Sequence, residues 1–133
     1  MFKNYPEVAL LIVRVTLGSV FFLHGAQKVF GWFGGSGLEG FVKWCSTINI
    51  PIWMAYMAAF TEFASGVSLL LGLWAEVGAL GAICVMTGAI YFVHLKSGYF
   101  AQNGGYEYAL NLLLFSLAIV IGGPGKLALI KLF

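Results

Sequence analysis

The chain alternates between long apolar blocks and short polar connections along its whole length. A transmembrane helix needs about 20 mostly apolar residues. Four blocks meet this requirement: Pro6–Phe30, Pro51–Trp74, Glu76–Leu95 and Tyr108–Ile130. The pattern therefore predicts an all-α integral membrane protein, a four-helix bundle formed by a single domain over residues 1–133. Because the number of spans is even, both termini are expected on the same side of the membrane.

The connections between these blocks differ in character. The first, residues 31–50, is glycine-rich (GWFGGSGLEG) and continues into FVKWCSTINI, a segment that suits the membrane interface. Trp32, Trp44 and Trp53 are expected in the aromatic belt at headgroup level. The sequence GGPGK (Gly122–Lys126) near the end of the fourth block predicts an earlier end to the last helix, which would leave LALIKLF as an interfacial tail.

Composition supports a membrane protein and limits the kinds of partner that it is expected to bind. The 133 residues are 61% hydrophobic and 9% charged, with a net charge of +2. The few basic residues are scattered singly, so no nucleic acid is expected as a partner, whereas the lipid bilayer is. The first block is expected to be retained rather than cleaved, because Arg14 interrupts its apolar core and no small-residue cleavage site follows.

Arg14 and Glu62 lie inside two of the apolar blocks. An uncompensated charge near a bilayer centre costs at least about 2.5–3.5 kcal/mol, so such residues are usually paired and often functional. Counted from Pro6 and Trp74, Arg14 lies about 12 Å and Glu62 about 18 Å from the terminal side. The sequence therefore predicts an intramembrane polar pair between Arg14 and Glu62. Its role as a catalytic group or as a structural clasp is left open.

Small residues recur at helical spacing on three of the blocks. Gly18 and Gly25 share a face with Arg14, Gly66 shares one with Glu62, and Gly81 lies on the third block. Small residues allow membrane helices to approach closely. These stripes predict packing seams between the helices.

A second polar cluster is predicted at the opposite, loop side of the bundle. It consists of His24, Lys28, His94, Glu107 and Asn111, all near helix ends. Three interpretations stay open: ordinary interfacial residues at helix ends, a site for a polar headgroup such as a quinone ring or a small oxyanion, and a metal or b-type haem held by His24 and His94. Two histidines without further ligand spacing are a weak metal signal, so no metal site is predicted and haem is disfavoured.

Common catalytic motifs are absent from the sequence. Cys45 and Cys84 form no CxxC and are expected at different depths, which argues against a dithiol mechanism. No nucleophile elbow, phosphate loop or zincin motif occurs. No catalytic residue can be assigned, and any chemistry is expected to use a bound cofactor, a lipid-soluble substrate or a partner subunit.

At these residues the sequence resembles the DoxX family of small four-helix membrane proteins, which includes DoxD-like members. The matching stretches are RVTLGSVFFLHGAQKVFGWFGGSGLEGF, TEFASGVSLLLGLW, VHLKSGYF and GGYEYALNLLL. The resemblance implies a multi-pass protein of a bacterial cytoplasmic membrane with a loose link to respiratory or redox systems. It carries over no catalytic residue.

Two functional hypotheses follow. The first is a membrane component of a redox or respiratory system, such as a quinone-linked oxidoreductase subunit, that binds quinone or another small lipophilic molecule in the bundle. The second is a non-catalytic membrane anchor or partner-recruiting subunit of a larger complex. A homo-oligomer is compatible with both. Substrate, partners, orientation and oligomeric state are not determined by the sequence.

Overall fold

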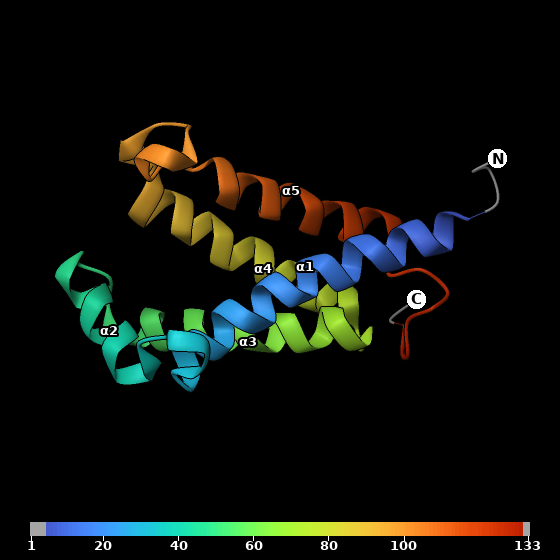
Figure 1. Ribbon diagram of the computed structural model, residues 1–133, viewed down its shortest axis with the longest axis horizontal. Coiled ribbons are helices and arrows are strands. Elements are labelled where there is room, and N and C mark those ends of the chain that lie inside the picture. The colour runs from blue at the N-terminus through green and yellow to red at the C-terminus, as the bar shows by residue number, and fades with distance from the viewer. Residues whose placement is uncertain (1–4, 132–133) are drawn as a thin grey trace.

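The computed structural model describes residues 5–131, and these residues form an all-helical fold (Figure 1). Four long helices account for most of it. Their bounds are α1 Pro6–Val29, α3 Ile52–Leu71, α4 Ala75–Ala89 and α5 Glu107–Gly122. Helices α1 and α3 are long and apolar enough to cross a membrane. Helix α4 also reaches that length when the helical turns that continue it to Ser97 are included. The all-helical membrane architecture is therefore confirmed.

A fifth α-helix corrects the predicted four-helix bundle. Helix α2, Gly37–Thr47, lies in the first connection, after a short 3-10 turn at Trp32–Gly34. In Figure 1 it lies beside the end of the long helices, next to the start of α3. The segment read as an interfacial connection is thus helical, because the glycines that precede it form turns and then give way to a run with apolar residues on one face.

The fourth span is shorter than the predicted Tyr108–Ile130. Helix α5 ends at Gly122, where Gly123 takes a φ of 79° and Pro124 follows. Its 16 residues extend about 24 Å, less than the thickness of about 30 Å of a hydrocarbon core. The end offered by GGPGK is therefore the one observed. The tail that follows turns back, and Ile130 exchanges backbone hydrogen bonds with Gly72 and Trp74; its last two residues lie outside the described residues.

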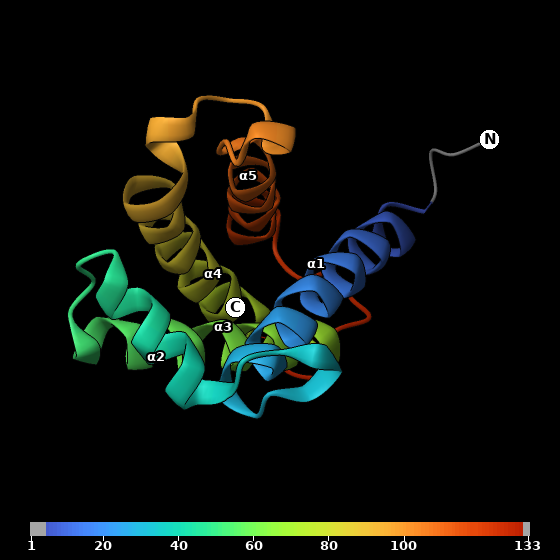
Figure 2. The same ribbon diagram turned by 60° about the vertical axis from the view of Figure 1, so that its left-hand side comes forward.

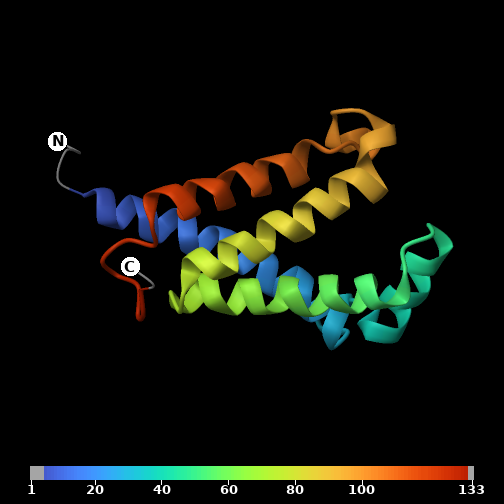
Figure 3. The ribbon, with the colours of Figure 1, turned by 180° about the vertical axis from the view of Figure 1, so that it is seen from behind.

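The helices pack in the order α1, α3, α4, α5. Helix α3 contacts both α1 and α4, and α5 contacts mainly α4 and only sparsely α1. Figure 2 shows α1 and α5 diverging, and Figure 3 shows α3, α4 and α5 in sequence as antiparallel neighbours. The beginning of α1 and the segment after α5 lie at the same end, where Glu7 accepts a hydrogen bond from the backbone N–H of Lys126.

The predicted seam between α1 and α3 is a close backbone contact. A Cβ atom built at Gly25 would lie 2.5 Å from Phe63 Cα, and one at Gly66 would lie 2.2 Å from the Phe22 nitrogen. Only glycine permits this approach. On α4, a Cβ at Gly81 would lie 2.7 Å from Ser65 Oγ of α3, whereas one at Gly88 would meet no atom within 4 Å. The small residues thus make seams between α1 and α3 and between α3 and α4, and leave open space near the end of α4.

Candidate functional site

Arg14 of α1 and Glu62 of α3 both belong to the described part of the chain, and they do not form the expected ion pair with each other. Arg14 donates from its two Nη atoms to the carbonyl oxygens of Leu69 and Leu127, each at 3.2 Å. Glu62 instead accepts from the Nζ of Lys28. The predicted pair is thus replaced by two separate arrangements, that of Arg14 at the C-terminal end of α3 and that of Glu62 at the middle of α3.

The register of α1 against α3 explains this correction. Arg14 lies level with Gly72, since a Cβ there would meet its Nη1, whereas Glu62 lies level with the last turns of α1, beside the contact of Gly25 with Phe63. The sequence-based estimate assumed that Pro6 and Trp74 lie at the same depth in the membrane. In the structure α1 begins about two turns farther out than the end of α3. The two charges therefore lie roughly 15 Å apart along the helices.

The Lys28–Glu62 pair is largely removed from solvent. The side chain of Glu62 is 3% exposed and that of Lys28 is 26% exposed. The ammonium also lies 5.4 Å from the centre of the Phe41 ring of α2, a distance at which a cation is attracted to an aromatic face. Three helices therefore converge on one charge: α1 supplies it, α3 neutralises it and α2 covers it.

This ion pair lines a cavity of about 600 Å³. The walls come from α2, α3, α4 and the π-helical turn Ile90–His94 that continues α4. Most of the lining is apolar or aromatic, and the polar groups are few: Lys28, Glu62, Thr61, His94 and the thiols of Cys45 and Cys84. A largely apolar cavity of this size with a few convergent polar groups is typical of a small-molecule site.

His94 is fixed by the loop that precedes α5. Its Nδ1 lies 2.8 Å from the carbonyl oxygen of Gly104, which can only accept a hydrogen bond. Nδ1 therefore carries a proton, and Nε2 is the nitrogen left to exchange a hydrogen bond or a proton. The residue lies on a π-helical turn, a local distortion often found at functional sites.

The other members of the predicted loop-side cluster do not line this cavity. His24 is exposed, and its ring lies 6.4 Å from that of Tyr108 on α5. Glu107 accepts a hydrogen bond of 3.0 Å from the backbone of Ala101 and orders the loop. Asn111 is exposed on α5. The structure thus places Lys28, Glu62 and His94 in the wall of one cavity, which His24, Glu107 and Asn111 do not line.

The sequence did not reveal the two cysteines and two of the tryptophans as neighbours of this site. Trp44 and Cys45 of α2, Trp53 of α3 and Cys84 of α4 all line the cavity, and both cysteines are free. Burial raises the pKa of the Cys45 thiol, and the nearby Lys28 ammonium partly offsets that rise. The one signal for this arrangement was the segment FVKWCSTINI, which combines aromatic residues with a cysteine. Because the segment was expected to be a connection between spans, the sequence did not indicate which helices its apolar face would contact.

Comparison with known proteins identifies a family for this chain and two relatives. The DoxX family model matches residues 9–95. The chain is 36% identical over 124 residues to "Putative oxidoreductase CatD" of Bacillus subtilis (strain 168), covering 92% of this chain and 85% of CatD. It is 30% identical over 128 residues to an uncharacterized protein of Haemophilus influenzae, covering 92% of this chain and 81% of that protein. No solved structure matches the chain. The protein is a multi-pass membrane protein and belongs to the DoxX family.

Proposed function

We propose that this protein is a membrane component of a redox system and that it binds quinone, or a similar small lipophilic molecule with a polar ring, in the cavity between α2, α3 and α4. The observation that carries the proposal is the Lys28–Glu62 pair, with its carboxylate buried, in the wall of a largely apolar cavity of about 600 Å³. The oxidoreductase name of CatD supports the redox part of the proposal.

The polar groups suit both redox forms of such a ring. Lys28 can donate a hydrogen bond to a quinone carbonyl, and Nε2 of His94 can accept one from a quinol hydroxyl. Reduction of a quinone takes up two electrons and two protons. Glu62 and His94 are the groups able to exchange the protons, and the electrons would come from a redox partner in a larger, respiratory-type complex.

Tryptophan fluorescence provides a direct test, because two of the four tryptophans line the cavity and two do not. The protein in lipid nanodiscs is titrated with a short-chain naphthoquinone. Saturable quenching is expected in the wild type and in the control variant Trp32→Phe/Trp74→Phe. It is expected to be largely lost in Trp44→Phe/Trp53→Phe.

The ion pair is tested in the same titration. Lys28→Met is expected to weaken naphthoquinone binding about tenfold or more, as the loss of one hydrogen bond from a charged group predicts. Quenching that does not saturate, or that is equal in both tryptophan double variants, would overturn the proposal. Absent binding, together with loss of a copurifying polypeptide in Glu62→Gln, would favour the non-catalytic, partner-recruiting subunit instead.

A further inference from the structure

A second cavity lies at the terminal end of the molecule, remote from the Lys28–Glu62 pair. Its volume is about 580 Å³. It is bounded by the first turns of α1, the start of α4, the end of α5 and the segment that follows α5. Four charged residues line it: Glu7, Glu76, Lys126 and Lys131. Neither the redox proposal nor the family assignment involves this site.

Glu76 is the unexplained group in this cavity. It is 8% exposed, and its Oε2 is buried with no hydrogen-bond partner among residues 5–131. Its place in the first turn of α4 favours a negative charge, because the free N–H groups of a helix N-terminus give a positive end. A buried carboxylate without a donor is nevertheless costly. Within residues 5–131, Oε2 of Glu76 therefore has neither a hydrogen-bond donor nor a cation to offset its burial.

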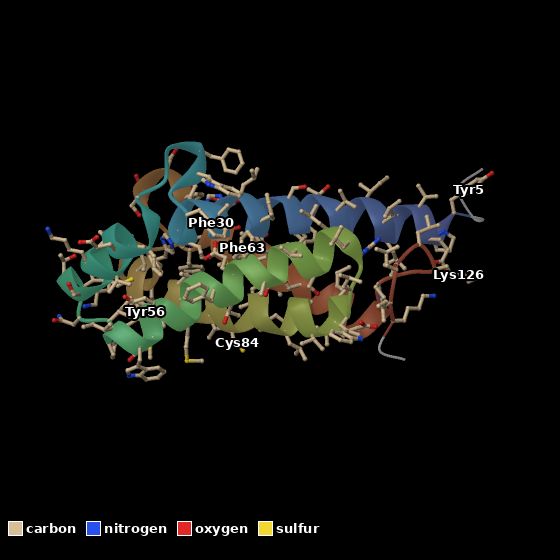
Figure 4. All side chains as sticks on the ribbon, turned by 90° about the horizontal axis from the view of Figure 1, so that it is seen from below. Tyr5, Phe30, Tyr56, Phe63, Cys84 and Lys126 are labelled. Carbon is tan, nitrogen blue, oxygen red and sulfur yellow. The ribbon has the colours of Figure 1, made fainter. Side chains whose placement is uncertain are left out.

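The other carboxylate is already engaged. Oε2 of Glu7 accepts the backbone N–H of Lys126, which holds the segment after α5 against α1. Figure 4 shows Lys126 beside the start of α1, close to Tyr5. Lys126 and Lys131 are exposed and make no ion pair within the described residues. Within the described residues, the cavity therefore offers one carboxylate oxygen without a hydrogen-bond donor, from Glu76, and two ammonium groups without an ion-pair partner.

The remaining walls are apolar and come from Leu10, Leu80, Val120 and Ile121. They belong to the ends of three membrane helices, so the cavity is expected at the level where acyl chains meet headgroups. A ligand suited to it carries an apolar part, an anionic group for the lysines and a hydrogen-bonding cation for Glu76.

We propose that this cavity binds one membrane phospholipid whose headgroup carries both a phosphate and a primary ammonium, as in phosphatidylethanolamine. The phosphate contacts Lys126 and Lys131, and the ammonium donates to Glu76. A phosphatidylcholine headgroup matches the charges but has no N–H to donate. Phosphatidylglycerol supplies the anion but brings no cation to Glu76. A bare metal ion would be repelled by the two lysines.

The test is lipid retention measured by native mass spectrometry. Protein from nanodiscs containing equal amounts of phosphatidylethanolamine, phosphatidylcholine and phosphatidylglycerol is released, and the bound lipids are counted. The wild type is expected to retain phosphatidylethanolamine roughly tenfold over phosphatidylcholine, the preference that a charge-assisted hydrogen bond provides. Glu76→Gln is expected to abolish this preference, and Lys126→Gln/Lys131→Gln to reduce retention of all three lipids.

A pocket-filling variant guards against indirect effects. At Gly122 a Cβ would approach only Leu10, at 4.0 Å, so Gly122→Leu should occupy the cavity without disturbing the helices. It is expected to exclude the lipid while naphthoquinone binding at the other end persists. Equal retention of the three lipids by the wild type, or an unchanged preference in Glu76→Gln, overturns the proposal. So does binding of a divalent cation that Glu76→Gln removes.

Discussion

At the scale of single residues, the buried Arg14 and the partly buried Lys28 have different roles. Arg14 is 1% exposed and donates to Leu69, whose carbonyl lies in the last turn of α3, and to Leu127 in the segment after α5. The last four carbonyls of a helix have no partner within it, and a cation there also complements the helix dipole. Arg14 therefore closes the end of α3, whereas Lys28 neutralises a carboxylate beside a cavity.

The Lys28–Glu62 pair makes a prediction about stability. Lys28→Met leaves Glu62 buried without a partner, which is expected to cost about 3–5 kcal/mol. Lys28→Met/Glu62→Gln removes both charges and should recover a large part of that loss. Thermal unfolding in detergent, followed by circular dichroism, provides the comparison. If the double variant unfolds at the temperature of Lys28→Met or below it, the two side chains are not energetically coupled as the structure implies.

At the scale of helices, the contact between α1 and α3 depends on the absence of side chains. The closest approaches involve Gly18, Gly25 and Gly66, and the rings of Phe30 and Phe63 flank the seam with centroids 5.2 Å apart (Figure 4). This seam fixes the register that sets Glu62 beside Lys28. Helix packing therefore determines the composition of the candidate site.

Gly25→Ala should reveal this dependence. Its methyl group would meet the Phe63 backbone, so the helices must separate, at an expected cost of about 1–3 kcal/mol. Gly88→Ala is the matched control, because it adds the same group to α4 where nothing lies within 4 Å. Chemical denaturation in mild detergent measures both. A loss of stability in Gly88→Ala as large as that in Gly25→Ala would contradict the assignment of the seam.

The helices could be predicted from the sequence, but their relative placement could not. Hydrophobic run lengths determined the first three spans closely, and the glycine stripes identified the α1–α3 seam. The depth of Arg14 relative to Glu62 failed because run length says nothing of how far one helix extends past its neighbour. The role of α2 escaped notice because its contacts, such as Phe41 with Lys28, join segments that no periodicity links.

At the scale of the whole molecule, the chain returns to the end at which it began. The contact of Glu7 with Lys126 and the backbone pairing of Ile130 with Gly72 and Trp74 join both ends of the chain to the turn between α3 and α4. The loop between Gly98 and Gly105 lies at the other end (Figure 3). The molecule thus has two polar ends of different composition.

This arrangement predicts the accessibility of the termini. When a protein carrying an epitope tag at each terminus is reconstituted in liposomes and treated with external protease, each molecule should lose both tags or neither. Immunoblotting for the two tags checks this. A control tag inserted in the loop of residues 98–105 should be cut in those molecules whose terminal tags survive. Molecules that retain one terminal tag only would contradict the topology.

The position of the cavity between α2, α3 and α4 has a consequence for how the quinone proposed to bind there would enter it. Met57 of α3 and Cys84 of α4 line it and are also exposed. Figure 4 shows Cys84 at the outer side of α4. That surface faces lipid in a membrane, so an entering molecule dissolves in the bilayer first and then moves sideways. Occupancy is then governed by the mole fraction of the molecule in the lipid. Adding ligand-free lipid while the total amounts of protein and quinone stay constant lowers the mole fraction of quinone in the bilayer. Occupancy of the site should then fall.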